Sequence, residues 1–326
     1  MLVHGPNGAG KTNLLEALHV GTQGFSPRAR SDAQMIRFGA DAALVALRGA
    51  LAAAPFETEV TLAARDARRA RLNGENLSSA ERLRTSLRTL VFTPDRLAVV
   101  KGAPATRRAY LDRSLGRLLP AKAALPVEYA AAVGQRNACL RRLRLGASSP
   151  DALGPWTERV VTLGEELVSA RRNVIELLSP AFAGLAGELG LEEAALTYDG
   201  EAPTLAELER RIDRDLDRGL TGAGPHLHDA RIESRGRDLR VYGSQGEQRV
   251  AVLALVLAEA HVLRSGPGGA PLVLLDDVLS ELDGDRRRAL AGIVSGLGQA
   301  VLTATDLHAL PATPAQALAV SPGRVA

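Results

Sequence analysis

The chain has 326 residues, of which 46% are hydrophobic and 24% are charged, and its formal net charge is +3. This composition is typical of a globular protein with one large or two ordinary domains, and no apolar run approaches the roughly 20 residues of a membrane-spanning helix. The single cysteine, Cys139, excludes an intramolecular disulfide and a cysteine metal cluster, and the N-terminus lacks a signal-peptide pattern, so we expect a cytoplasmic protein with no membrane partner.

The first element expected in the chain is a phosphate-binding loop. Gly5 to Thr12 read GPNGAGKT and fit the Walker A pattern G-x-x-x-x-G-K-[ST]. Glycines let backbone N–H groups turn onto phosphate oxygens, while Lys11 would reach the β and γ phosphates and Thr12 would offer its hydroxyl to Mg²⁺. The residues predicted to bind ATP are Gly5, Asn7, Gly8, Gly10, Lys11, Thr12 and Asn13. Because the pattern arises by chance in about one chain in 300, a second motif is needed to decide.

Helical and strand-like segments follow the loop. Apolar residues at helical spacing predict a helix over Asn13–Leu18, and the alternation in Phe56–Leu62 and Arg69–Gly74 predicts antiparallel strands. Thr89–Pro94 reads as a short buried strand. Long apolar-periodic runs predict helices between residues 104 and 191, and a further helical run covers residues 204–220.

A strongly basic stretch lies within this helical part of the chain. Residues 104–146 contain nine basic and two acidic residues. The basic ones are Arg107, Arg108, Arg113, Arg117, Lys122, Arg136, Arg141, Arg142 and Arg144. Such a block suits a polyanion, because neutralised phosphates release their counterions and supply sequence-independent affinity. A solvated helical face explains the same pattern equally well.

The last third of the chain alternates strands with helices. Arg237–Tyr242 alternates and predicts a strand, Pro271–Asp276 predicts a buried strand, and Gln299–Thr303 predicts a third. A helix is predicted over Gly284–Leu297. Strands that alternate with helices imply a parallel sheet. We therefore expect an α/β nucleotide-binding core made from both ends of the chain, with a helical insertion between them.

A second nucleotide motif ends one of these strands. Leu272 to Asp277 read LVLLDD, which is a Walker B sequence that carries an acidic pair to the edge of the sheet where ligands bind. We predict that Asp276 holds Mg²⁺ through its water shell and that Asp277 polarises an attacking water, so that Lys11 and Asp277 are the catalytic residues. Standing alone, the motif would read as a strand that ends in two solvated aspartates.

A serine and a glycine open a helix just ahead of that strand. Residues 242–249 read YGSQGEQR, and the helix that follows, Val250–Leu263, is apolar nearly all round and must be buried. The N-terminus of such a helix is a natural anion site, although an ordinary cap by Ser244 explains it equally well. Two further polar segments come later, Ser280–Asp283 and Thr303–Asp306.

Five segments in this order resemble the ATP-binding-cassette ATPases: Walker A, a signature helix, Walker B, a D-loop and a switch position at a strand end. The resemblance implies that two subunits meet head to tail, so that Ser244 of one reaches the γ-phosphate bound by Lys11 of the other. The residues of the signature, acting in trans, are Ser244, Gln245, Gly246 and Gln248, and the D-loop and switch residues are Ser280, Asp283 and Thr303. Asp95 follows the strand after which this superfamily carries a glutamine.

The size of the insertion indicates which group of ATP-binding-cassette proteins the chain resembles. The 233 positions between Lys11 and Ser244 exceed the spacing of transporter cassettes and fall short of that in relatives with long coiled coils. With Phe92–Leu97, Lys101–Asp112 and Leu274–Asp283, the chain resembles the RecF family of bacterial DNA replication and repair proteins. The fold implied is α/β: an ABC-type ATPase head with a mixed sheet core (lobe I, residues 1–95 and 236–326) and an inserted, largely helical lobe II (residues 96–235).

The resemblance also implies a function. It implies ATP-driven homodimerisation on DNA at gaps, slow, weakly DNA-stimulated ATP hydrolysis for release, and help in loading RecA together with RecR. The expected partners are double-stranded DNA, gapped or single-stranded DNA, RecR and a second copy of the chain, with DNA contacts at Arg107, Arg108, Arg141 and Arg142. One alternative is an ABC transporter-type ATPase subunit, against which the long insertion and the basic block stand, and another is a P-loop protein that no longer binds ATP.

The strand ahead of the loop raises a separate expectation. Members of the family carry two strands before the loop, and Met1–His4 corresponds only to the end of the second. We expect this to open an edge of the core sheet and to remove residues that help to hold the adenine.

Overall fold

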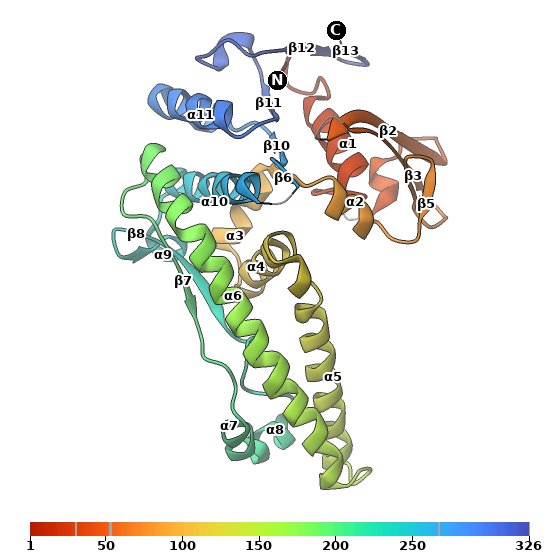
Figure 1. The fold of residues 1–326 in the computed structure, drawn as a ribbon, viewed down its shortest axis with the longest axis vertical. Helices are drawn as coiled ribbons and strands as arrows, with labels where there is room; N and C mark the ends of the chain where they lie inside the picture. Colours follow the sequence, from red (N-terminus) through yellow and green to blue (C-terminus); the bar gives the residue numbers. More distant parts are fainter. Residues whose placement is uncertain (30, 52–53, 267, 326) are drawn as a thin grey trace. The chain divides into compact units, whose positions relative to one another are not determined.

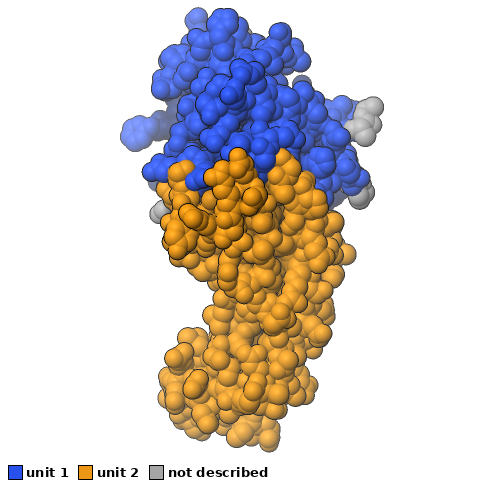
Figure 2. Space-filling view, turned by 90° about the vertical axis from the view of Figure 1, so that its left-hand side faces the viewer, with its two compact units in different colours: residues 1–97, 185–191, 245–326 blue, residues 98–184, 192–244 orange. Residues whose placement is uncertain are grey.

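The computed structural model describes residues 1–29, 31–51, 54–266 and 268–325 of the chain. The chain forms two compact units, coloured separately in Figure 2. Unit 1 comprises residues 1–97, 185–191 and 245–326, and unit 2 comprises residues 98–184 and 192–244. Both ends of the chain therefore belong to unit 1.

Unit 1 is built on a six-stranded sheet (Figure 1). Its strands are β1 (Leu2–His4), β6 (Thr89–Phe92), β10 (Leu272–Leu275), β11 (Ala300–Ala304), β12 (Ala317–Ser321) and β13 (Arg324–Val325). In space their order is β13-β12-β1-β11-β10-β6, and every pairing is parallel except that of β12 with β13. The strands predicted at residues 89–94, 271–276 and 299–303 are confirmed as β6, β10 and β11, and so is the parallel sheet.

The strand before the loop lies inside this sheet. β1 pairs with β12 on one side and with β11 on the other, in the registers Leu2↔Ala317 and Leu2↔Leu302. The strand before the loop is therefore not an edge of this sheet, while the predicted opening of an edge and loss of adenine contacts stay predictions. Among the described residues, the edges of the sheet are β6 and β13.

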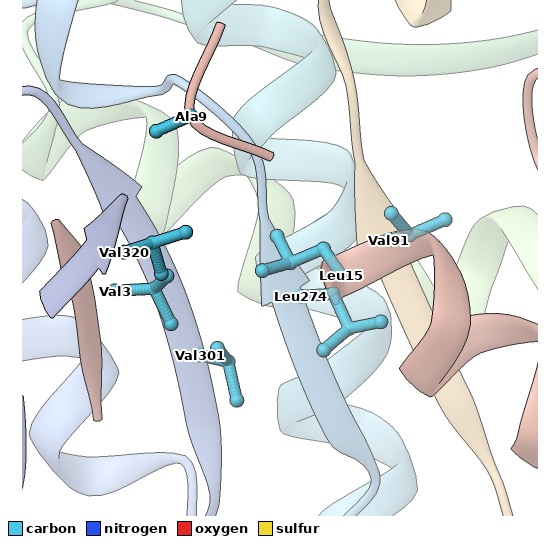
Figure 3. Close-up of a cluster of buried hydrophobic side chains, with 7 residues drawn as sticks. All are labelled: Val3, Ala9, Leu15, Val91, Leu274, Val301 and Val320. Carbon is cyan, nitrogen blue, oxygen red and sulfur yellow. The ribbon is translucent and has the colours of Figure 1, made fainter. Parts of the chain in front are cut away.

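Three helices belong to this part of unit 1: α1 (Lys11–Gln23), α10 (Gln245–Ser265) and α11 (Gly284–Gly296). Figure 3 shows one core cluster, in which strands, loop and α1 contribute together. Its members are Val3, Ala9, Leu15, Val91, Leu274, Val301 and Val320. The prediction that the helix over Val250–Leu263 is buried is confirmed, since most side chains of α10 are inaccessible to water. This packing fixes the loop, through Ala9, directly on the sheet.

A second, antiparallel sheet completes unit 1. It has the order β2-β3-β4-β5, with β2 at Ala42–Leu51, β3 at Ala54–Ala63, β4 at Arg69–Leu72 and β5 at Glu75–Leu77, and α2 (Glu81–Ser86) follows it. The antiparallel strands predicted near residues 56–62 and 69–74 are confirmed as β3 and β4. Val20 of α1 packs with Val60 and Leu62 of β3 and with Leu83 of α2. One face of the sheet is thus anchored on the helix that follows the loop.

Unit 2 is mainly helical, as Figure 1 shows. Its helices are α3 (Ala98–Lys101), α4 (Pro104–Leu118), α5 (Leu125–Arg144), α6 (Gly154–Glu188, whose last residues belong to unit 1), α7 (Leu205–Arg210), α8 (Ile212–Arg218) and α9 (Leu239–Tyr242). A small antiparallel sheet joins β7 (Ala195–Asp199), β8 (Asp229–Ser234) and β9 (Arg237–Asp238). Short 3-10 helices occupy Asp32–Met35, Pro94–Leu97, Pro120–Lys122, Pro150–Leu153, Leu279–Glu281 and Leu307–Ala309.

The strand predicted over Arg237–Tyr242 is wrong. Only Arg237–Asp238 pairs as a strand, and the chain then turns into α9. The Asp238 side chain accepts a hydrogen bond from the Arg240 amide at 2.8 Å, which caps a helical turn and buries Leu239. The predicted lobe boundaries at 95/96 and 235/236 stay a prediction, while the compact units place residues 185–191 in unit 1 and residues 236–244 in unit 2.

Ionisable groups inside unit 2 are paired with one another. The Tyr129 hydroxyl lies 2.8 Å from His226 Nδ1, and His226 Nε2 lies 2.9 Å from the Thr221 carbonyl oxygen. This geometry suits a neutral imidazole that donates from Nε2 and accepts from the tyrosine. Burial lowers the pKa of His226 and raises the pKa of Tyr129, so both groups are held neutral. These residues therefore have a structural role, because their hydrogen bonds are made within the interior of unit 2.

Candidate functional site

The carboxyl ends of four parallel strands bring the predicted nucleotide motifs to one edge of the sheet in unit 1. The loop from Gly5 follows β1, Asp276 and Asp277 follow β10, Thr303 lies near the end of β11, and Thr93 follows β6. This edge is where open α/β sheets bind their ligands. Residues from both ends of the sequence thus meet in one unit.

The loop owes its shape to its glycines. Gly5, Gly8 and Gly10 have φ angles of 155°, 80° and 103°, which residues with a side chain rarely adopt. At Gly5 a Cβ would also lie 2.1 Å from the backbone oxygen of Val320 on the neighbouring strand. Lys11 Nζ donates to the carbonyl oxygens of Gly5, at 2.8 Å, and Pro6, at 3.0 Å. The ammonium group is therefore held over the loop.

The N-terminus of α1 faces the same loop. Gly10 stands at its N-cap, and among the described residues no side chain caps it and no acidic residue lies in its first turn. The first amide N–H groups of a helix have no partner within it, and together with the helix dipole they favour an anion. The exposed residues Asn7, Gly8 and Asn13 lie on either side of this turn. The arrangement fits the phosphates of a nucleotide.

Thr12 and Asp276, the two residues expected to hold Mg²⁺, meet at the end of β10. Thr12 Oγ1 donates to Asp276 Oδ1 at 3.1 Å, and Asp276 is only 6% exposed. A hydroxyl and a carboxylate beside a phosphate-binding loop are the hard ligands that Mg²⁺ prefers. Both residues therefore fit the predicted cofactor.

Asp277 has a different environment from its neighbour. Its φ angle is 51°, in the left-handed region, and its side chain is exposed. It lines a hollow of about 370 Å³ together with Thr305, Asp306 and His308. Its amide donates to Thr303 Oγ1 at 2.7 Å, and its carbonyl oxygen accepts from Ser280 Oγ at 2.9 Å. The carboxylate is thus presented to water by a backbone that is fixed on both sides.

The predicted D-loop is held by its own contacts. The Asp283 side chain accepts from the Arg286 amide at 2.9 Å and caps α11. Arg287 Nε donates to the carbonyl oxygens of Leu279 and Leu282, both at 2.9 Å. The segment after Asp277 therefore has a defined shape, while its role as a D-loop stays a prediction.

The signature residues begin a helix, as predicted. Ser244 is exposed and immediately precedes α10, whose first turns contain Gln245, Gly246 and the buried Gln248. Ser244 is the last residue of unit 2, whereas Lys11 belongs to unit 1. The predicted joint action of the two residues across a dimer stays a prediction.

The four arginines predicted to contact DNA differ in their surroundings. Arg107 is 4% exposed and forms a two-pronged ion pair with Asp229, at 2.7 and 2.6 Å. It ties α4 to β8 within unit 2 and cannot meet a phosphate without breaking this pair, so the structure removes it from the DNA-binding candidates. Arg108 donates to the His228 carbonyl oxygen at 2.7 Å, and burial lowers its pKa. Arg141 and Arg142 are exposed in the last turn of α5.

Two features of the site were not predicted from the sequence. Thr93, rather than the exposed Asp95, lines a small hollow with Thr12 and Asp276. Its signal in the sequence is its place as the first polar residue after the apolar strand that Pro94 ends. The second feature is the bonding of Thr303 to both Walker B aspartates, for which the sequence carries no signal because it depends on the register of β11 beside β10.

Comparisons with known proteins give relatives that match most of the chain. Residues 1–310 match the family described as RecF/RecN/SMC N terminal domain. The DNA replication and repair protein RecF of Heliobacterium modesticaldum is 35% identical over 321 residues, covering 94% of this chain and 86% of the relative. RecF of Anaeromyxobacter sp. (strain K) is 39% identical over 323 residues, covering 93% of this chain and 85% of the relative.

Two solved structures are similar in fold to this chain. The structure titled recombination mediator protein RecF-ATP in the RecFOR pathway has a TM-score of 0.86 and 26% identity, covering 100% of this chain and 90% of that one. The Smc head domain of Pyrococcus furiosus shares the fold alone, with a TM-score of 0.58 and 16% identity over 100% of this chain and 89% of that one. The predicted α/β head of the ABC-type ATPases is thereby confirmed. The chain belongs to the RecF family.

Proposed function

We propose that this protein binds and hydrolyses ATP and uses it to control its binding to DNA in replication and repair. One observation carries the proposal: Thr12, Asp276, Thr303 and Asp277 form a continuous hydrogen-bonded chain beside Lys11 and the glycine loop. Relatives named DNA replication and repair protein RecF, and a solved RecF structure named for its ATP, support the same reading.

Each residue of the site has a separate task in this proposal. The amides of the loop and of the first turn of α1 bind the phosphates, and Lys11 neutralises the β and γ positions. Thr12, and Asp276 through the water shell, would hold Mg²⁺, which would neutralise negative charge on the transferred phosphoryl group. Asp277 orients a water and accepts its proton. The site thereby separates metal binding and water activation between two adjacent aspartates.

The proposal extends to a head-to-tail dimer. Ser244, Gln245, Gly246 and Gln248 of one copy would complete the site around Lys11 of the other, with Ser280 and Asp283 at the joint. ATP would then join two copies, and its hydrolysis would release them from DNA. Further steps of this proposal are recognition of gaps, partnership with RecR and assistance to RecA.

Replacing Lys11 with Met tests the first step. The change removes the cation over the loop but leaves the glycine backbone intact, so we expect ATP binding to fall at least about a hundredfold and ATP-stimulated DNA binding to be lost with it, consistent with losing a charge-assisted contact to phosphate. Fluorescent nucleotide titration measures the first effect and filter binding the second. Lys101→Met, at an exposed lysine of unit 2, is the matched control. DNA binding by Lys11→Met that still responds to ATP would contradict the proposal.

The exposed arginines at the end of α5 test the DNA surface. If Arg141 and Arg142 neutralise phosphates, changing both to Ala should make the slope of log affinity against log salt shallower by about 0.9 for each lost contact on duplex DNA. Titrations at four salt concentrations give the slope. Arg82 and Arg84, exposed on α2, form the control pair with the same loss of charge. An unchanged slope would show that Arg141 and Arg142 merely complement the dipole at the helix end.

A further inference from the structure

Thr303 connects the two Walker B aspartates. Its side chain is 1% exposed, and its Oγ1 donates to Asp276 Oδ1 at 2.9 Å and accepts from the Asp277 amide at 2.7 Å. A hydroxyl has a single hydrogen to donate. In this arrangement Thr303 gives that hydrogen to Asp276, while its oxygen accepts from the Asp277 amide. The predicted role of Thr303 as a switch residue stays a prediction.

The backbone of Asp277 needs such a contact. Residues other than glycine seldom adopt the left-handed region, and although aspartate tolerates it better than most, its surroundings must hold it there. Here the amide of Asp277 is held by Thr303 and its carbonyl oxygen by Ser280, at 2.7 and 2.9 Å. The backbone of Asp277 is thus held on both sides of its Cα. Of the two residues that hold it, Thr303 also bonds to Asp276.

The position of Thr303 makes this contact rigid. Thr303 lies on β11, paired with Val3 of β1 on one side, while Leu302 before it pairs with Leu275 of β10 on the other. Thr12 shares the same oxygen of Asp276, but it comes from α1 and lies at 3.1 Å. When Thr12 turns its hydroxyl toward a metal ion, the bond from the central strand remains to orient the carboxylate.

We propose that Thr303 is a positioning residue that couples the metal-binding carboxylate of Asp276 to the water-activating residue Asp277. The catalytic consequence of this inference rests on the proposed function. The coupling itself consists of two hydrogen bonds that are present without nucleotide. Loss of the hydroxyl keeps both carboxylates but removes one of the two contacts that hold the backbone of Asp277, so its side chain can shift. A small misplacement of a catalytic group is enough to lower a rate by about a hundredfold.

The test compares Thr303→Val, which keeps the shape without the hydroxyl, with Thr303→Ser, which keeps the hydroxyl. We expect the valine variant to hydrolyse ATP at least about tenfold more slowly while ATP affinity changes less than about threefold, and the serine variant to stay close to the parent. Without nucleotide, amide exchange at Asp277 should become at least about tenfold faster in the valine variant only. Thr89→Val removes another buried threonine hydroxyl, which bonds Thr22 at 2.8 Å, and should lower stability without slowing hydrolysis.

The outcomes separate the two proposals. Normal hydrolysis and normal exchange in Thr303→Val, or equal losses in Thr303→Ser, would overturn the positioning role. If the parent protein neither binds nor hydrolyses ATP, the proposed function is wrong. Faster amide exchange at Asp277 in Thr303→Val would even then support the coupling. If the valine variant does not fold, Thr303→Cys replaces it in the comparison with serine, because a thiol is only a weak donor.

Discussion

Replacing Asp277 with Asn is expected to lower ATP hydrolysis by about a hundredfold or more while ATP binding persists, in line with the loss of a general base. Asparagine keeps the size of the side chain and tolerates the left-handed backbone that this position requires, where φ is 51°. Asp276 and its bonds to Thr12 and Thr303 do not involve the Asp277 side chain. The change therefore removes the carboxylate charge from the water-facing hollow and little else.

Single-turnover hydrolysis and nucleotide titration, measured on the same preparation, separate the two effects. If the dimer is released by hydrolysis, the variant should also remain dimeric with ATP for longer than the parent. Asp285→Asn, which changes an exposed aspartate of α11, is the matched control and should hydrolyse normally. Hydrolysis by Asp277→Asn at the parent rate would show that another residue of the hollow, such as Asp306 or His308, positions the water.

The parts of the fold that could be predicted are those that local chemistry determines. Glycines at fixed spacing specify the loop, and largely apolar runs specify β6, β10 and β11, whatever lies elsewhere in the chain. β2 escaped prediction because its ten residues, rich in alanine and largely exposed, show no strong alternation of apolar and polar side chains. α9 was mistaken for a strand because a single helical turn is too short to show a helical period.

The basic block at residues 104–146 shows why a cluster of charges in a sequence does not identify what the charged side chains bind. Arg136 is fully buried and pairs with Asp215 at 2.8 Å, and Arg107 pairs with Asp229, 122 positions away. Both carboxylates lie outside the block, so counting charges within it overestimates the charge that is available to DNA. A buried arginine without its partner would be strongly destabilising, whereas an exposed one costs little. Only tertiary structure distinguishes Arg107 from Arg141.

The same reasoning applies to the site. Walker A and Walker B could each be recognised alone, but their meeting depends on β1 lying beside β11 and β11 beside β10. The bonds from Thr303 to Asp276 and Asp277 form only when β10 and β11 pair in this register. Sequence therefore predicts which groups do the chemistry, while the groups that orient them appear only when strands are placed side by side.

Replacing Ser244 with Arg is expected to leave ATP binding at Lys11 nearly unchanged and to abolish ATP-dependent dimerisation and hydrolysis. Ser244 is exposed and immediately precedes α10, so the substitution adds bulk and charge at the surface without disturbing the buried residues of the helix. In a site confined to one subunit the change should be silent. In a shared site it blocks the approach of the partner's γ-phosphate. Sedimentation with and without ATP measures dimerisation, and Ser265→Arg, at the exposed C-terminal end of the same helix, is the matched control.

Mixing this variant with Lys11→Met decides between one-subunit and two-subunit chemistry. Each variant alone lacks every complete site, since one has no functional signature and the other has no phosphate-binding lysine. A mixed dimer regains one site, formed by the intact Lys11 of one chain and the intact Ser244 of the other, while its second site carries both defects. Neither variant dimerises with ATP by itself, so the mixed pair is the dimer that forms. Because each mixed dimer has one of two sites, up to about half of the parent ATPase should return at equal amounts. A mixture as inactive as its components, or normal hydrolysis by Ser244→Arg alone, would show that the two motifs do not share a nucleotide.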